Sequence, residues 1–315
     1  MNFKINKYLL LSFLIVLLII CISFYQYYKP KLKYVNEYNI IKENCYEKKN
    51  VNHEFCRLSY YQDEEYLKWY VENNNPQESL KELDIVTVTS EIVKHEAYSV
   101  MQFLSPLIIM IAVIGSIHTD FSTGMIKNYL TRESYNTYIK KKYLIILKSA
   151  LIIPVSLVII FIVSCFTTNF NTNVADSVKE IAVYSDFKYS YFCLYFIGIC
   201  IIQFFMSILF ANIGLFCCKK NKNKLVAMSL GYILFLIIDI VIYIVIYALI
   251  LVKIFNLNIF WEYFNITGYW FADSGSSLLT FLIFAFVLQL ISSICIYYFY
   301  KNKEGVVQAS EKQIA

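Results

Sequence analysis

The stretch that decides the fold is residues 225–252, LVAMSLGYILFLIIDIVIYIVIYALILV, in which Asp239 is the only charged side chain. A helix rises about 1.5 Å per residue, so a stretch of this length can cross the roughly 30 Å hydrocarbon core of a bilayer. A lipid-exposed backbone must satisfy its own hydrogen bonds, and a continuous apolar run therefore indicates a helix and not a barrel strand. The stretch predicts a membrane-spanning helix.

Long apolar stretches occur throughout the chain. Of the 315 residues, 58% are hydrophobic and only 16% are charged, against roughly 25% charged in ordinary soluble domains. This composition excludes a soluble domain, because a water-facing shell cannot cover so much apolar surface. We therefore predict an all-α membrane protein with six transmembrane helices, at residues 8–27, 98–118, 143–166, 191–218, 225–252 and 276–300.

Lysine and arginine in the short loops set the orientation of the predicted spans. With both termini in the cytoplasm, the loops on that side hold few acids and most of the basic residues, including Lys140 to Lys142, Lys219, Lys220, Lys222 and Lys224. We therefore predict a multi-pass protein with both termini cytoplasmic. The heavy use of Lys, Asn, Ile and Tyr suggests a bacterial origin, and hence the bacterial plasma membrane.

The predicted spans divide the chain into segments of different character. The expected segments are 1–27 (N-terminal tail and first span), 28–97 (an extracellular insert), 98–118 (second span), 119–142 (a cytoplasmic hairpin), 143–300 (the other four spans) and 301–315 (a cytoplasmic tail).

The insert combines aromatic residues with many charged ones. Residues 63–70 have a helical pattern that residues 73–76 interrupt, and residues 85–89 fit either a short strand or the approach to the second span. Cys45 and Cys56 are the only cysteines outside the predicted spans. On the oxidising outer side they can form a disulfide, and the alternative is two free thiols.

The sequence contains no pattern for catalysis or for nucleotide binding. It has no G-x-x-x-x-G-K-[ST] loop, no H-E-x-x-H zinc motif and no G-x-S-x-G elbow, and its three histidines are scattered. We therefore predict that this chain is not an enzyme, and that it binds no metal or cofactor itself.

Several polar side chains lie inside the predicted spans. Asp239 stands near the middle of its span, where a carboxylate costs roughly 2.5–3.5 kcal/mol and needs a partner or a wet cavity. One interpretation is a path for a substrate or an ion, and the other is a hydrogen bond that serves helix packing, for example with Tyr243 one turn away. The same two interpretations apply to Gln203, Asn212 and Gln289.

The loop after the second span carries the most informative pattern. It reads HTDFSTGMIKNYLTR from His118 to Arg132 and continues as ESYNTYIKKK. Asp120 or Ser122 can begin a helix here, and Thr137 can begin a second one. The loop predicts a short amphipathic hairpin against the cytoplasmic face, and a basic loop that anchors anionic lipid is the alternative.

This loop resembles the corresponding loop of ABC-2 type transporter permeases. The resemblance rests on the pattern Asp120-x-x-x-Gly124-x-Ile126-Lys127-Asn128-x-Leu130-Thr131-Arg132 and on its position after the second of six spans. A long first outer loop and cytoplasmic termini extend the similarity over most of the chain. Departures from the usual family pattern occur at Met125, at Glu133 and at Tyr135 or Asn136.

The resemblance implies that residues 119–142 form a coupling hairpin that docks into a groove of a separate cytosolic ATPase subunit, which would bind ATP and Mg²⁺. It also implies a helical hairpin that dips into the outer leaflet near residues 253–275, where aromatic residues are crowded. The residues implied to couple the chain to the ATPase are Asp120, Gly124, Met125, Ile126, Lys127, Leu130 and Arg132.

We therefore expect the permease subunit of an ATP-driven ABC exporter, working as a homodimer or with a related permease, surrounded by membrane lipids and without a nucleic-acid partner. Apolar, aromatic-rich spans favour an amphipathic peptide, an antimicrobial or a lipid-like substrate. Two alternatives remain. One is a non-transporting immunity or sensor protein that binds a peptide through the insert, and the other is a six-span membrane enzyme that uses Asp239.

Overall fold

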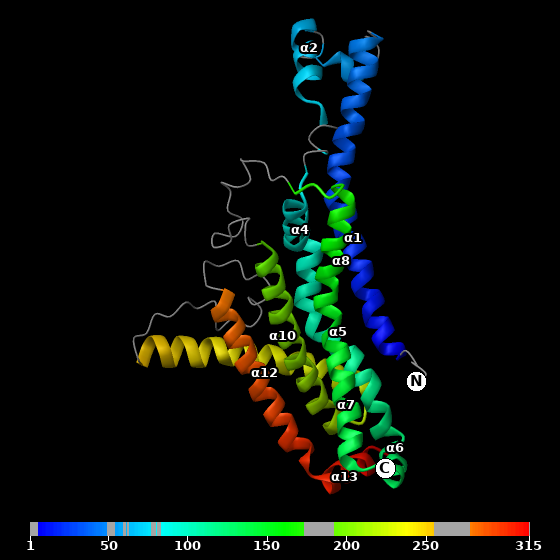
Figure 1. The fold of residues 1–315 in the computed structure, drawn as a ribbon, viewed down its shortest axis with the longest axis vertical. Helices are drawn as coiled ribbons and strands as arrows, with labels where there is room; N and C mark the ends of the chain where they lie inside the picture. The colour runs from blue at the N-terminus through cyan, green and yellow to red at the C-terminus, as the bar shows by residue number, and fades with distance from the viewer. Residues whose placement is uncertain are drawn as a thin grey trace. The chain divides into compact units, whose positions relative to one another are not determined.

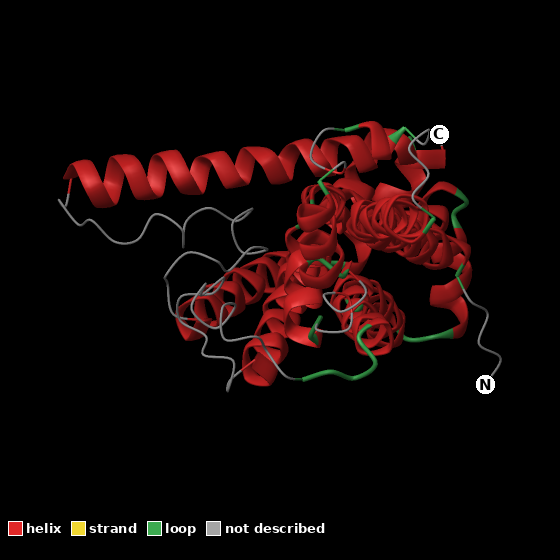
Figure 2. Cartoon of the chain, turned by 90° about the horizontal axis from the view of Figure 1, so that it is seen from above, coloured by secondary structure: helices red, strands yellow, loops and turns green. Residues whose placement is uncertain are grey.

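The computed structural model describes residues 6–48, 54–58, 61, 63–76, 80, 83–172, 192–254 and 278–314 (Figure 1). Every regular element in these residues is a helix, and none is a strand (Figure 2). Six helical segments of this part of the chain are long and apolar enough to cross a membrane. The prediction of an all-helical fold with six membrane-length helices is therefore confirmed.

The six candidate spans are each built from one or two consecutive helices. They are α1 (Lys7–Ile40) with the π-helix η1 (Ile41–Glu47), α5 (Glu96–Ser122), α7 (Tyr135–Ala150) with α8 (Ile152–Thr167), α10 (Phe192–Lys220), α11 (Lys224–Ile240) with the π-helix η5 (Val241–Ile254), and α12 (Leu278–Lys301). The shorter helices are η2 (Phe55–Arg57), α2 (Glu64–Asn73), α4 (Ile85–Lys94), α6 (Met125–Arg132) and α13 (Lys303–Ile314). From residue 255 on, the predicted outer hairpin lies outside the described residues.

Two helices of the structure have bounds that the length of the apolar runs does not predict. The first helix continues past residue 27 to Ile40, and an ion pair between Lys33 and Glu37 one turn apart supports this extension. Asp84 accepts a hydrogen bond from the backbone N–H of Thr87 and begins α4. Residues 85–89 are therefore helical, and of the two interpretations the strand is wrong.

The chain divides into two compact units. Unit 1 comprises Met1–Ile19, Ala97–Ile159 and Ala182–Ala315, and unit 2 comprises Ile20–Glu96 and Ile160–Ile181. Each unit is described by itself.

Unit 2 contains a small core closed by a disulfide bond. Cys45 and Cys56 are joined in this bond, which is one of the two alternatives that the sequence leaves open. With Ile41 and Leu67 they form a buried cluster where η1, η2 and α2 meet. Burial beside this cluster raises the pKa of the Tyr70 phenol above its ordinary value. Part of the predicted insert is thus a structured element with its own core.

In unit 1, α10 is the helix around which the others pack. It contacts α12, α11 and α7 (Figure 1). Phe210 of α10 meets Phe235 of α11 edge to face, with ring centroids 5.0 Å apart. Small residues allow close approach elsewhere, as is common between membrane helices. Gly115 of α5 is the clearest case, because a β-carbon at this position would overlap the Tyr8 ring of α1.

The contact at Gly115 can be tested with a matched glycine on α13. We expect Gly115→Ala to reduce the free energy of unfolding by about 1–3 kcal/mol, because the added methyl group must displace Tyr8. Gly305→Ala adds the same helix propensity but meets only ordinary van der Waals contacts, so it should be neutral or stabilising by up to about 1 kcal/mol. Thermal unfolding in detergent micelles measures both effects, and equal stability of the two variants would contradict the close contact.

Candidate functional site

One end of unit 1 carries most of its described basic residues. At this end α6 and α13 contact each other, and α13 also contacts α10 and α12 (Figure 1). We call it the basic end. Its lysine and arginine residues are Lys127, Arg132, Lys140, Lys141, Lys142, Lys219, Lys220, Lys222, Lys224, Lys301, Lys303 and Lys312.

A glycine turn joins α5 to α6 at the basic end. Gly124 has φ 68° and ψ 10°, a left-handed conformation that glycine adopts without steric cost. Because α5 runs through Asp120 to Ser122, the predicted helix start at either of these residues is wrong. The second helix of the hairpin, α7, begins at Tyr135 and not at Thr137, since the Ser134 hydroxyl accepts a hydrogen bond from the Thr137 N–H.

A buried ion pair holds the hairpin to the membrane helices. Asp120 of α5 pairs with Lys142 of α7, and the exposed fractions of the two side chains are only 9% and 16%. The Lys142 Nζ also lies 5.1 Å from the ring centroid of Tyr138 and 5.8 Å from that of Tyr129 on α6. One cation thus contacts side chains of α5, α6 and α7, and it fixes α6 relative to the other two.

The helix α6 buries one face and exposes the other. Ile126 is fully buried within the chain, so it cannot contact a partner directly. Met125 is 45% exposed, and Lys127 and Arg132 are exposed as well. Of the seven residues predicted to couple the chain to an ATPase, the structure places Met125, Lys127 and Arg132 outward, Asp120 and Ile126 inward, and Gly124 and Leu130 in half-buried positions.

The helix α13 was not predicted, and it braces α6 from the other side. The Ser310 hydroxyl donates a hydrogen bond to the backbone carbonyl of Phe121 at 2.9 Å. The Glu311 carboxylate lies 2.6 Å from the Lys127 Nζ, and the Gln313 amide donates to the carbonyl of Cys218 at 3.0 Å. The sequence contains a signal for this helix, because Asn302 can cap a helix and Val306 and Ser310 are spaced to lie on one helical face. In the structure Asn302 caps the helix, and Val306 and Ser310 are both buried.

The polar residues predicted inside the spans fall into different environments. The Asn212 amide of α10 donates to the hydroxyls of Ser292 and Ser293 on α12 at 2.9 and 3.1 Å, and the Gln289 amide also donates to Ser293 at 3.1 Å. The two bonds of Asn212 join α10 to α12, as expected for a residue that holds helices together, whereas the bond of Gln289 lies within α12. Asp239 lies on α11 in a half-buried position.

Gln203 lies in a different environment from Asn212 and Gln289. Its side chain is fully buried on α10, and neither its amide oxygen nor its amide nitrogen has a hydrogen-bond partner in the described part of the chain. Buried amides are rarely left in this state, since each unsatisfied group costs about 1–3 kcal/mol. Of the four polar residues singled out from the sequence, Gln203 is therefore the one that most requires a functional explanation.

The Asp120–Lys142 pair can be tested against an exposed pair on the same hairpin. We expect Asp120→Asn to reduce the free energy of unfolding by about 3 kcal/mol, because it leaves the Lys142 charge buried without its partner. Glu133→Gln breaks the pair with Lys141, whose side chains are 30% and 55% exposed, and should cost under about 1 kcal/mol. Thermal unfolding in detergent micelles gives the comparison. Combining Asp120→Asn with Lys142→Met should recover much of the loss, and no recovery would argue against the pair as its cause.

Comparison with known proteins gives no family assignment. No protein-family model matches the chain, and no curated protein or solved structure matches it either.

Proposed function

We propose that this chain is the membrane-spanning permease subunit of an ATP-driven transporter of the ABC-2 type, which exports an amphipathic peptide, an antimicrobial or a lipid-like substrate. The observation that supports this proposal is the geometry of α6. Its outer face presents Met125, Lys127 and Arg132, while its inner face is held by the rest of unit 1. A rigid, basic surface with an apolar contact is what an ATPase subunit needs for docking.

The rigidity of α6 matters because a docked ATPase can move the membrane helices only through a stiff connection. The Asp120–Lys142 pair joins α5 to α7, the contact of Lys142 with the Tyr129 ring connects α6 with this pair, and α13 connects α6 with α10 and α12. A displacement of α6 would therefore reach four spans together. In this proposal ATP hydrolysis takes place in the partner subunit, and the work of this chain is mechanical.

The proposal assigns the basic end to the cytoplasm, in agreement with the positive-inside rule. It also ranks the residues that can line a translocation path. The unsatisfied amide of Gln203 would gain hydrogen bonds whenever water or a polar group passes it, whereas Asn212 and Gln289 already bond to serines. Gln203 is therefore the first candidate for the path, and Asp239 is the second.

Charge reversal on the outer face of α6 tests the proposal. An N-terminally tagged chain purified from its native membranes should carry along a P-loop ATPase and hydrolyse ATP. The double variant Lys127→Glu/Arg132→Glu should reduce both the bound ATPase and the hydrolysis at least tenfold, since it replaces two outward cations by anions.

The control for this experiment is Glu311→Gln. This variant removes the ion pair of Lys127 with α13 but leaves the outward charge of α6 in place, so the ATPase should remain bound. Purification of the unchanged chain without any ATPase, or an ATPase that stays on the double variant, would contradict the proposal.

A second candidate is a non-transporting immunity or sensor protein, and the surface of unit 2 favours it. Trp69 of α2 is 53% exposed, and Tyr46 and Tyr66 are exposed as well, close in sequence to the disulfide-closed cluster. Exposed aromatic residues on a rigid support are typical of peptide-binding surfaces.

The two candidates make opposite predictions for survival of expressing cells under an antimicrobial peptide. If unit 2 acts as the peptide receptor, Trp69→Ala should abolish protection and Lys127→Glu/Arg132→Glu should leave it unchanged. If the chain is a transporter, the double variant on α6 should abolish protection. The survival of each strain at a fixed peptide dose decides between them.

A further inference from the structure

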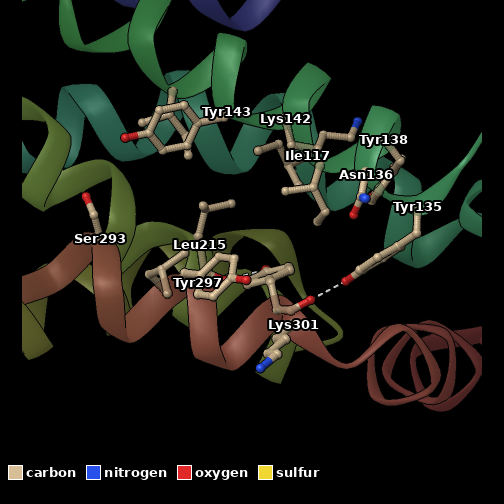
Figure 3. Close-up of a pocket in the computed structure, with 14 residues that line it drawn as sticks. Ile117, Tyr135, Asn136, Tyr138, Lys142, Tyr143, Leu215, Ser293, Tyr297 and Lys301 are labelled. Atoms are coloured by element: carbon tan, nitrogen blue, oxygen red, sulfur yellow. Dashed lines mark hydrogen bonds between the residues drawn. The ribbon is translucent and has the colours of Figure 1, made fainter.

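A cavity of about 190 Å³ lies at the basic end of unit 1, between α7 and α12 (Figure 3). Ile117 of α5 and Leu215 of α10 complete its wall. The cavity belongs to the membrane-spanning part of the fold, because both helices that flank it are parts of candidate spans. None of the residues predicted as a site from the sequence lines it.

The cavity changes character along its length. Tyr135 begins α7 and Lys301 ends α12, so both lie at the ends of their helices. Ile146 lies about 16 Å further along α7, at about 1.5 Å per residue, and Ser293 lies further inside α12. Figure 3 shows Tyr135 and Ser293 at opposite sides of the cavity. The cavity therefore extends from the helix ends toward the interior of the spans.

Apart from Ser293, the inner part of the cavity is apolar, and its outer part is basic. Ile139, Ile146 and Ile296 contribute aliphatic surface. Lys301 is exposed at the helix end, and no described carboxylate forms an ion pair with it. Lys142 also lines the cavity, but its charge is already compensated by Asp120. The Lys301 Nζ lies 5.8 Å from the centroid of the Tyr298 ring, and Figure 3 shows this side chain pointing away from the cavity. Rotation of this exposed side chain would bring its cation to the mouth of the cavity.

Hydrogen bonds between helices keep this cavity in place. The Tyr135 hydroxyl of α7 donates to the backbone carbonyl of Tyr300 on α12. The Tyr300 hydroxyl in turn donates to the carbonyl of Leu215 on α10 at 2.9 Å. Both tyrosines line the cavity, so the bonds that join the three helices also form its walls. A preformed cavity lowers the cost of ordering the site when a ligand binds.

We propose that this cavity binds one anionic phospholipid of the surrounding membrane. The lipid phosphate lies at Lys301, where a lysine at a helix end reaches the headgroup level, and the first part of an acyl chain lies against Ile139, Ile146 and Ile296. A soluble phosphate would use the cation but not the aliphatic wall, and a neutral lipid would use the wall but not the cation. This inference needs only the helical membrane fold, and it does not rest on the proposed transport function.

Lipid titration of the delipidated, detergent-purified full chain tests the proposal. Phosphatidylglycerol, phosphatidylcholine with the same acyl chains, and inorganic phosphate are added separately, and native mass spectrometry counts the bound molecules. We expect one phosphatidylglycerol to bind about fivefold more tightly than phosphatidylcholine, which corresponds to one favourable lysine–headgroup contact. Inorganic phosphate at the same concentration should not displace it.

Two matched variants locate the site. Lys301→Ala should weaken phosphatidylglycerol binding about fivefold, whereas Lys303→Ala, an exposed lysine two residues on and outside the cavity, should change it less than twofold. Ile296→Trp fills the cavity without changing any charge, and it should abolish this binding event for both lipids. Thermal unfolding verifies that each variant is folded.

Three results would overturn the proposal. Equal weakening by Lys301→Ala and Lys303→Ala would show only general attraction to a basic surface. Displacement of the lipid by inorganic phosphate would identify a free anion as the ligand. Unchanged binding in a folded Ile296→Trp variant would place the lipid outside the cavity.

Discussion

The buried ion pair between Asp120 and Lys142 is the interaction on which the basic end depends. The side chains of Asp120 and Lys142 are largely removed from water, and an isolated buried charge costs several kcal/mol. Each charge is therefore stable here only when it is paired with the other. The pair therefore fixes the position of α7 against α5, and the rings of Tyr129 and Tyr138 around the same cation fix α6. Lys142 also forms part of the cavity wall, so the hairpin and the cavity share one structural constraint.

Much of the fold follows from the length of the apolar runs, because each run is long enough to determine a spanning helix by itself. The helix ends are less predictable, since they depend on single side chains. The cap at Asp84 makes residues 85–89 helical, although their β-branched composition also fits a strand. The helix α13 is short and polar, and it is stabilised mainly by contacts with Phe121, Lys127 and Cys218, which lie far away in the sequence.

The candidate site is only partly predictable for the same reason. The loop pattern indicates which residues belong to the hairpin, but the packing of α13 and α7 decides which of them face outward. Ile126 fits an apolar interface contact in the sequence, yet the structure buries it completely. Likewise, the pairing of Asn212 with Ser292 and Ser293 joins residues about 80 positions apart, which composition and spacing cannot reveal. Gln203 resembles these residues in the sequence, and only packing distinguishes its unsatisfied amide.

The position of α13 has a practical consequence for labelling this protein. Its last turns lie directly against α6, because Ser310 and Glu311 bond to the residues on either side of the Gly124 turn. A fluorescent domain or an epitope fused after Ile314 would follow directly on Gln313, which bonds to the carbonyls of Cys218 and Lys219, and would therefore crowd the basic end. Fusions for interaction studies should therefore be placed before the first helix.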